Sequence, residues 1–178
     1  MKNLKDYIQE GILDSNNINN MDNDMLSLYP TPTRKDFNQD ITGSWYIGWS
    51  CSGLVQPLLK KYPQAFDNKY GDINKVNGIT AHITKPSGFK TYDVELKFNS
   101  ANDWYYSQIF GIEEAGLKLS DAKKLVLDLF NHLQKYPNAL EYLIRTCEEQ
   151  IKKSEAQIKN NKISFITSIN IKKILSVK

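Results

Sequence analysis

Three side chains have the types and the spacing of a nucleophile, a base and an orienting acid. Cys51 opens the segment Cys51-Ser52-Gly53, which predicts a turn into a helix over residues 54–66. A thiol at a helix N-terminus is more readily ionised, because the helix dipole favours the thiolate. A histidine can then act as base, oriented by a third polar group. By position these partners are His82 and Asp93, so one interpretation of the chain is a cysteine hydrolase.

Three predicted strands position these residues. Residues 44–49 are rich in strand formers, and two alternating segments follow, with apolar residues at Ile79, Ala81 and Ile83 and then at every second residue from 92 to 98. Between them, residues 86–89 (Pro-Ser-Gly-Phe) are typical of a turn. With residues 87–88 as the turn, Ile83 faces Tyr92, and His82 lies across from Asp93.

The run from Cys51 to Gln56, Cys-Ser-Gly-Leu-Val-Gln, resembles the nucleophile segment of NlpC-type cell-wall cysteine peptidases, in which Cys-Ser-Gly opens a helix. The chain departs from that family at Ser50, where the family has Asp, and at Pro57, which interrupts the helix that should follow. The interval from Cys51 to His82 is also shorter than is usual in that family. The structural alternative is that Cys51 is a small buried residue and that His82 and Asp93 form an exposed cross-strand pair.

No other motif predicts a cofactor or a metal site. The two Cys and two His have no zinc-site spacing, and the chain contains neither a glycine-rich phosphate loop nor a dinucleotide fingerprint. The Asp- and Asn-rich run after residue 14 lacks the Gly and Glu of a calcium loop. His132 lies near the end of a predicted helix, where it favours the helix dipole without any catalytic role.

Composition predicts one folded domain with extensions. The chain has 178 residues, of which 40% are apolar and 11% aromatic, enough for a core and for some surface aromatics that suit partner binding. Two Cys without a pairing motif fit a reducing compartment. Residues 159–178 hold five Lys and no acid, so the net charge of +3 belongs to the tail. A near-neutral body argues against a nucleic-acid-binding groove.

The first thirteen residues predict a short amphipathic helix. Leu4, Tyr7, Ile8 and Ile12 fall on one helical face, with charged and amide side chains on the other. So short a helix is marginal alone in water, so we expect this face to bind a partner. The segment is too short to span a membrane and has no secretory cleavage pattern.

The start of the chain, Met-Lys-(x)2-Lys-Asp-Tyr-Ile-Gln-Glu-Gly, resembles the capsid-targeting sequences of internal head proteins in T-even-like bacteriophages. In that group the prohead protease cuts after an Ile/Leu-x-Glu triplet, so the resemblance implies processing between Glu10 and Gly11. Residues 112–114 (Ile-Glu-Glu) fit the same triplet, and only the position at the terminus distinguishes the first match. The alternative is a terminal helix that docks on its own domain or on a partner.

The remaining chain predicts an α+β fold, a small antiparallel sheet of three to four strands packed by two C-terminal helices. We expect a flexible polar linker over 14–40, a globular domain over 41–160 and a basic, apolar tail over 161–178. Residues 103–110 predict a further strand, and the periodic apolar positions of 120–136 and 138–158 predict the two helices, separated at Pro137. The tail fits no period, so an edge strand, a helix or an oligomer contact through 138–178 all remain open.

Three hypotheses for function follow. The first is a virion-associated phage protein whose N-terminal helix binds capsid or scaffold and whose domain is a non-enzymatic cargo, located in the virion or the host cytoplasm. The second is the cysteine peptidase or amidase that uses Cys51, His82 and Asp93. The third is a host-directed protein-interaction or inhibitor module, with exposed aromatics as contacts.

Overall fold

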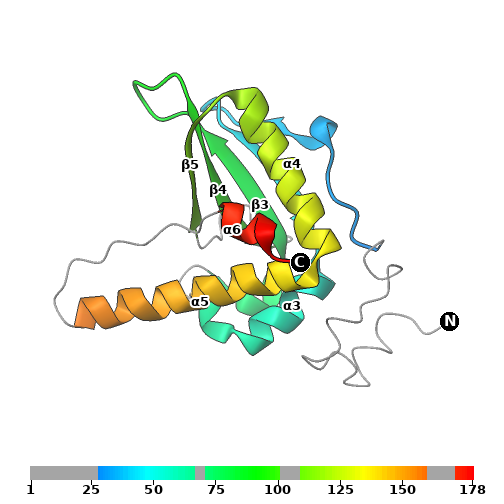
Figure 1. Ribbon diagram of the computed structural model, residues 1–178, viewed down its shortest axis with the longest axis vertical. Coiled ribbons are helices and arrows are strands. Elements are labelled where there is room, and N and C mark those ends of the chain that lie inside the picture. Colours follow the sequence, from blue (N-terminus) through cyan, green and yellow to red (C-terminus); the bar gives the residue numbers. More distant parts are fainter. Residues whose placement is uncertain (1–27, 67–70, 101–108, 160–170) are drawn as a thin grey trace.

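The computed structural model describes residues 28–66, 71–100, 109–159 and 171–178. The chain has an α+β fold, in which helices pack on a five-stranded antiparallel sheet of order β1-β2-β3-β4-β5 (Figure 1). The elements in chain order are η2 (Arg34–Asp36), β1 (Asn38–Gln39), β2 (Trp45–Ser50), α3 (Ser52–Lys61), η3 (Pro63–Ala65), η5 (Ile73–Lys75), β3 (Val76–Thr84), β4 (Tyr92–Ser100), β5 (Ile109–Leu117), α4 (Leu119–Lys135), α5 (Pro137–Lys159) and α6 (Ile171–Ser176).

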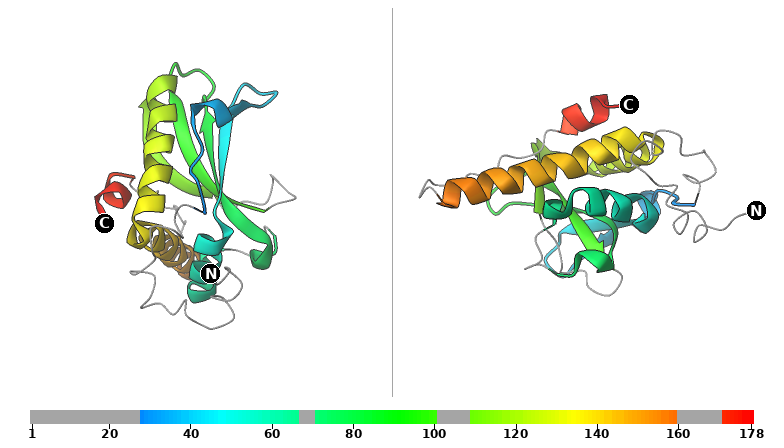
Figure 2. Two further views of the ribbon diagram at one scale, coloured as in Figure 1. Left: turned by 90° about the vertical axis from the view of Figure 1, so that its right-hand side faces the viewer. Right: turned by 90° about the horizontal axis from the view of Figure 1, so that it is seen from below.

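The helices form a layer on one face of the sheet. In Figure 2, α4 runs along this face, and α5 lies between α3 and α6. The alternating apolar residues of β3 and β4 point into this layer, as their spacing predicted, and so do Ile47 and Trp49 of β2. They meet fully buried side chains of α4 such as Leu129, Phe130 and Leu133. Burial of apolar side chains on one face is what fixes which side of each strand faces the helices.

The predicted register of the central hairpin was wrong by two residues. His82 pairs with Glu95 and Thr84 with Asp93, whereas a two-residue turn at 87–88 would have paired His82 with Asp93. The turn itself is present, since the Phe89 amide donates to the Pro86 carbonyl at 3.1 Å. It is flanked by unpaired residues, so the ladder begins further from it. A shift of two residues in register leaves every side chain on the same face of the sheet. Apolar residues of β3 therefore still lie across from apolar residues of β4.

The sheet has five strands rather than the three to four predicted. The additional strands are β1, which pairs with the start of β2, and β5, which pairs with β4. Of the strand predicted over 103–110, residues 103–108 lie outside the described part of the chain, and residues 109–110 begin β5. The triplet at 112–114 therefore lies inside a paired strand.

The helices differ in detail from their predictions. α3 begins at Ser52 and ends before Pro63, and it contains Pro57 beyond its first turn. α4 begins at Leu119, one residue before the predicted range 120–136, and its N-cap is Lys118. α5 begins at Pro137, as predicted.

The folded body extends beyond the predicted range 41–160 on both sides. Phe37 belongs to the core, and β1 belongs to the sheet. In the tail, residues 171–176 form α6, whose Ile171 and Ile174 are buried in the same core. This segment therefore packs on its own domain.

Candidate functional site

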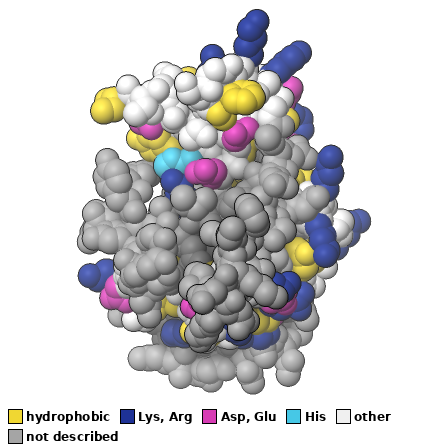
Figure 3. Space-filling view, turned by 90° about the vertical axis from the view of Figure 1, so that its left-hand side faces the viewer, with side chains coloured by type: hydrophobic (Ala, Val, Ile, Leu, Met, Phe, Trp, Pro, Cys, Tyr) yellow, Lys and Arg dark blue, Asp and Glu magenta, His cyan; other side chains and the backbone are white. Residues whose placement is uncertain are grey.

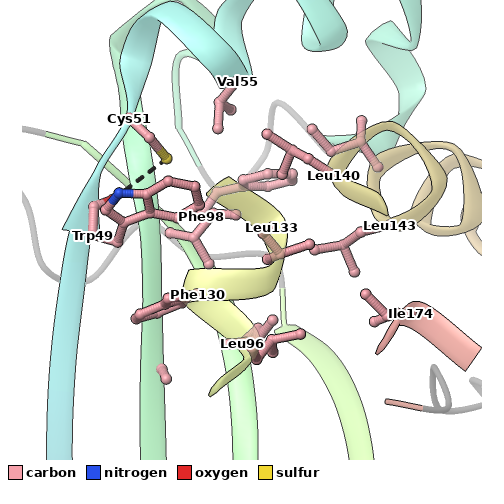
Figure 4. Packing of buried hydrophobic residues seen from close by; sticks show 14 of the residues in the cluster. Trp49, Cys51, Val55, Leu96, Phe98, Phe130, Leu133, Leu140, Leu143 and Ile174 are labelled. Atoms are coloured by element: carbon pink, nitrogen blue, oxygen red, sulfur yellow. Dashed lines mark hydrogen bonds between the residues drawn. The ribbon is translucent and has the colours of Figure 1, made fainter. Parts of the chain in front are cut away.

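Cys51 lies at the junction of β2 and α3, where the sequence placed it, but it faces the core. Its side chain is fully buried, and its Sγ donates to the Trp49 carbonyl at 3.6 Å (Figure 4). Around it lie Val55 and Phe98 in an apolar cluster (Figure 4). Burial raises the pKa of the Cys51 thiol far above its ordinary value, because the thiolate would lose its hydration. The thiol is therefore protonated and shielded, the reverse of an activated nucleophile.

His82 is neither near Cys51 nor on the same side of the sheet. Ser50 pairs with Gly78, and His82 lies four positions further along β3. At about 3.3 Å per residue this offset alone is about 13 Å. His82 also lies on the face of β3 opposite to the buried Ile79, Ala81 and Ile83, since side chains alternate along a strand.

Asp93 does not orient His82. It pairs with Thr84, two residues beyond His82 on β3. The structure therefore brings none of the three predicted catalytic residues together.

The surroundings of His82 show a partly buried, neutral imidazole. Its ring stacks on Tyr46 with centroids 6.1 Å apart, and its cross-strand neighbour is Glu95. Burial is the main cause that lowers the pKa of His82 to about 4, and the charge of Lys97 acts in the same direction, against the opposing effect of Asp40. The imidazole is uncharged at neutral pH. Among the described residues no group of three or more His, Cys, Asp or Glu is placed to hold a metal ion.

The other histidine is structural. The His132 Nε2 lies 2.7 Å from the Val177 carbonyl oxygen, and the His132 ring packs on Tyr136 at 4.7 Å. The Asn138 side chain donates to the Lys178 carbonyl at 3.2 Å. These two contacts fasten the end of the described chain to α4 and α5.

The feature that sequence reasoning missed is the Tyr29 anchor, by which we mean Tyr29 and its contacts with Trp49, Gly53 and Gln134. The Tyr29 carbonyl accepts hydrogen bonds from Trp49 Nε1 at 3.1 Å and from Gln134 Nε2 at 2.7 Å. The Gly53 amide at the start of α3 donates to the Tyr29 hydroxyl, and burial raises the pKa of that phenol. The hydroxyl thus satisfies one of the amides that a helix N-terminus leaves without a partner.

The Tyr29 anchor requires glycine at position 53. A Cβ on Gly53 would overlap the Tyr29 Oη and lie 2.7 Å from its Cζ. Next along the chain, the Thr31 hydroxyl donates to the Asn131 side chain on α4. The stretch 29–31 is therefore fixed across β2, α3 and α4.

The residues predicted to bind a partner, Leu4, Tyr7, Ile8 and Ile12, and the predicted processing site at Glu10 and Gly11 lie outside the described residues. Within the described part of the chain, no helix combines the length and the hydropathy needed to cross a bilayer.

Comparison with known proteins gave no match to a family model, to a curated protein or to a solved structure.

Proposed function

We propose that this chain is a virion-associated phage protein, in which the N-terminal amphipathic helix binds capsid or scaffold and the α+β domain is a non-enzymatic binding cargo. The observation that carries the proposal is the run from Met1 to Gly11, which combines the apolar helical face with the Met-Lys start and the Glu10-Gly11 step of a capsid-targeting peptide. Its partners are a capsid or scaffold protein and, after delivery, a host protein. A homo-oligomer through residues 138–178 is part of the same proposal.

The Tyr29 anchor supports this arrangement. Hydrogen bonds from Trp49 and Gln134 hold the chain at residue 29, which gives the N-terminal segment a fixed point of attachment to the body. A targeting peptide on a polar arm reaches its receptor without disturbing the domain that it carries.

The geometry favours a binding role over catalysis. Cys51 is buried with a raised thiol pKa, and His82 lies on the opposite face of the sheet. We therefore expect Cys51→Ala to leave every activity of the protein unchanged.

The test is packaging during infection. Tagged full-length protein is produced in cells infected by a T-even-like phage, and particles are purified and analysed by immunoblot and intact mass. We expect recovery in particles of a form that begins at Gly11. The double variant Leu4→Asp, Ile8→Asp removes the apolar face and should lose packaging at least tenfold, whereas Lys5→Gln on the opposite face should not.

A second variant separates targeting from processing. Glu10→Ala should be packaged at the normal level but retain Met1. Equal packaging of wild type and of the Leu4, Ile8 double variant, or absence of both from particles, would contradict the proposal.

A further inference from the structure

Two large apolar side chains project from one end of the sheet. Ile41 and Phe89 are 105% and 64% exposed, and among the described residues only Leu28 is a comparable exposed apolar side chain. Ile41 lies in the turn before β2, and Phe89 in the turn after β3. Because Trp45 at the start of β2 pairs with Ile83 near the end of β3, the two turns lie at the same end of the sheet.

Both turns are held rigid by hydrogen bonds. The Asp40 carboxylate accepts from the Thr42 amide, the Thr42 hydroxyl and the Ser44 amide at 2.8, 2.6 and 3.0 Å, which leaves Ile41 at the tip. In the second turn the Phe89 amide bonds to Pro86, and Gly88 takes a φ of +83°. An apolar residue held outward by a rigid turn loses little conformational entropy when it binds a partner.

Basic side chains surround the two tips. Lys85 and Lys90 flank the Phe89 turn, and further exposed basic residues at this end are Arg34, Lys35 and Lys118. Figure 3 shows Lys and Arg side chains projecting past hydrophobic ones at the top of the view. The acidic groups at this end are Asp36, Asp40, Asp93 and Asp121, one fewer than these basic residues, and the carboxylates of Asp36 and Asp40 are occupied by hydrogen bonds to their own turns.

We infer that this end of the sheet, which we call the tip face, docks on an anionic phospholipid surface, with Ile41 and Phe89 inserted among the headgroups and lysines against the lipid phosphates. A protein partner of ordinary size contacts about 800 Å² of continuous surface on each side. The tip face instead offers two separate apolar projections with basic residues at the same end of the sheet, an arrangement that suits a deformable surface. Each Lys near an anionic bilayer adds about fivefold in affinity at moderate salt.

The tip face lies on the folded domain and does not involve the N-terminal peptide. A test of the tip face can therefore succeed or fail independently of the proposed function. It is also compatible with the absence of a spanning helix in the described residues, because docking of this kind is peripheral.

The experiment is co-sedimentation of the full chain with vesicles of phosphatidylcholine alone or mixed with phosphatidylglycerol. We expect binding to the mixed vesicles only, weakened about tenfold by Phe89→Ser with Ile41→Ser and about 25-fold by Lys85→Gln with Lys90→Gln. Matched controls are Leu28→Ser, the third exposed apolar residue, and Lys60→Gln with Lys153→Gln, exposed lysines on α3 and α5. Both controls should bind as wild type does.

Three results would overturn the inference. They are no binding to mixed vesicles, equal binding to neutral vesicles, and binding that the tip and lysine variants leave unchanged. The last would assign vesicle binding to another segment, such as the N-terminal helix, which is present in every variant. Far-UV circular dichroism of each variant confirms that a lost interaction does not reflect unfolding.

Discussion

Replacing Gly53 should have opposite effects on stability, depending on whether Tyr29 is present. Glycine in a helix is about 1 kcal/mol less favourable than alanine, so Gly53→Ala would normally stabilise α3. Here the new Cβ overlaps the Tyr29 hydroxyl and lies 2.7 Å from Cζ, so the ring must leave its site. Displacement exposes a partly buried ring and breaks the bond from the Gly53 amide.

The magnitude follows from these losses. Re-exposure of part of an aromatic ring costs about 1–2 kcal/mol, and the lost hydrogen bond about 1 kcal/mol. Against a helical gain of up to about 1 kcal/mol, Gly53→Ala should lower the free energy of unfolding by about 1–2 kcal/mol in the wild type. In a Tyr29→Ala background the overlap is gone, and the same substitution should raise it by about 0.5–1 kcal/mol.

The assay is urea unfolding of the four proteins of this double-mutant cycle, followed by far-UV circular dichroism. Tyr29→Phe provides the intermediate case, because it removes the Oη overlap but keeps the close approach of Cζ. If Gly53→Ala is equally destabilising with and without Tyr29, the Tyr29 anchor is not the reason for glycine at this position, and the reasoning fails.

Three further predictions concern the buried and charged groups. Cys51 and Cys147 are both buried, so the native protein should react with a thiol reagent at least a hundredfold more slowly than the urea-unfolded chain, and comparable rates would show that a thiol is accessible. His82 has a folded pKa of about 4 against an ordinary 6.5, so as the pH falls from 6.5 towards 4 the unfolded chain takes up a proton that the folded chain does not. Stability should therefore fall over this window by about 1–2 kcal/mol, because solvent screening of the partly exposed ring reduces the roughly 3 kcal/mol of the full shift, and His82→Asn should flatten the profile measured by urea titration at each pH. Glu141 accepts from Lys61 and Tyr62, both at 2.7 Å, so Glu141→Gln should destabilise the fold by about 0.5–1 kcal/mol in thermal melts, and by less in 1 M salt.

The faces of the strands could be predicted from the sequence, whereas their register could not. Alternation at Ile79, Ala81 and Ile83 fixes which side is buried, because burial has the period of the pleat. Register depends on how many residues the turn excludes from the ladder, and the Pro86–Phe89 signal does not encode that number. β5 escaped prediction because residues 111–116, Gly-Ile-Glu-Glu-Ala-Gly, are mostly poor strand formers, so its pairing with β4 overrides local propensity.

The predicted catalytic set contained a signal against itself. Cys51 lies two residues after the inward-facing Trp49, so continued alternation points it inward as well. His82 lies one residue from the buried Ala81 and Ile83, so alternation places it on the outer face of β3. Applying the alternation rule to the candidate residues separates them onto two faces. The Tyr29 anchor is indicated only weakly by the sequence. Two features point to it: the indole N–H of Trp49, which needs an acceptor when buried, and Gly53 early in a helix.

The order of strands in the sheet repeats their order along the chain. Each new strand therefore pairs with the one made just before it, and the longest connection between described neighbours, residues 51–75 between β2 and β3, contains a helix of its own, so pairing stays local in sequence, which favours rapid folding. On the ribosome the sheet can extend strand by strand, with α4 covering the finished face. The contacts of His132 and Asn138 with Val177 and Lys178 join positions 45 and 40 residues apart, so they form only once these C-terminal residues have emerged. Synthesis thus builds the sheet first and completes the helical layer last.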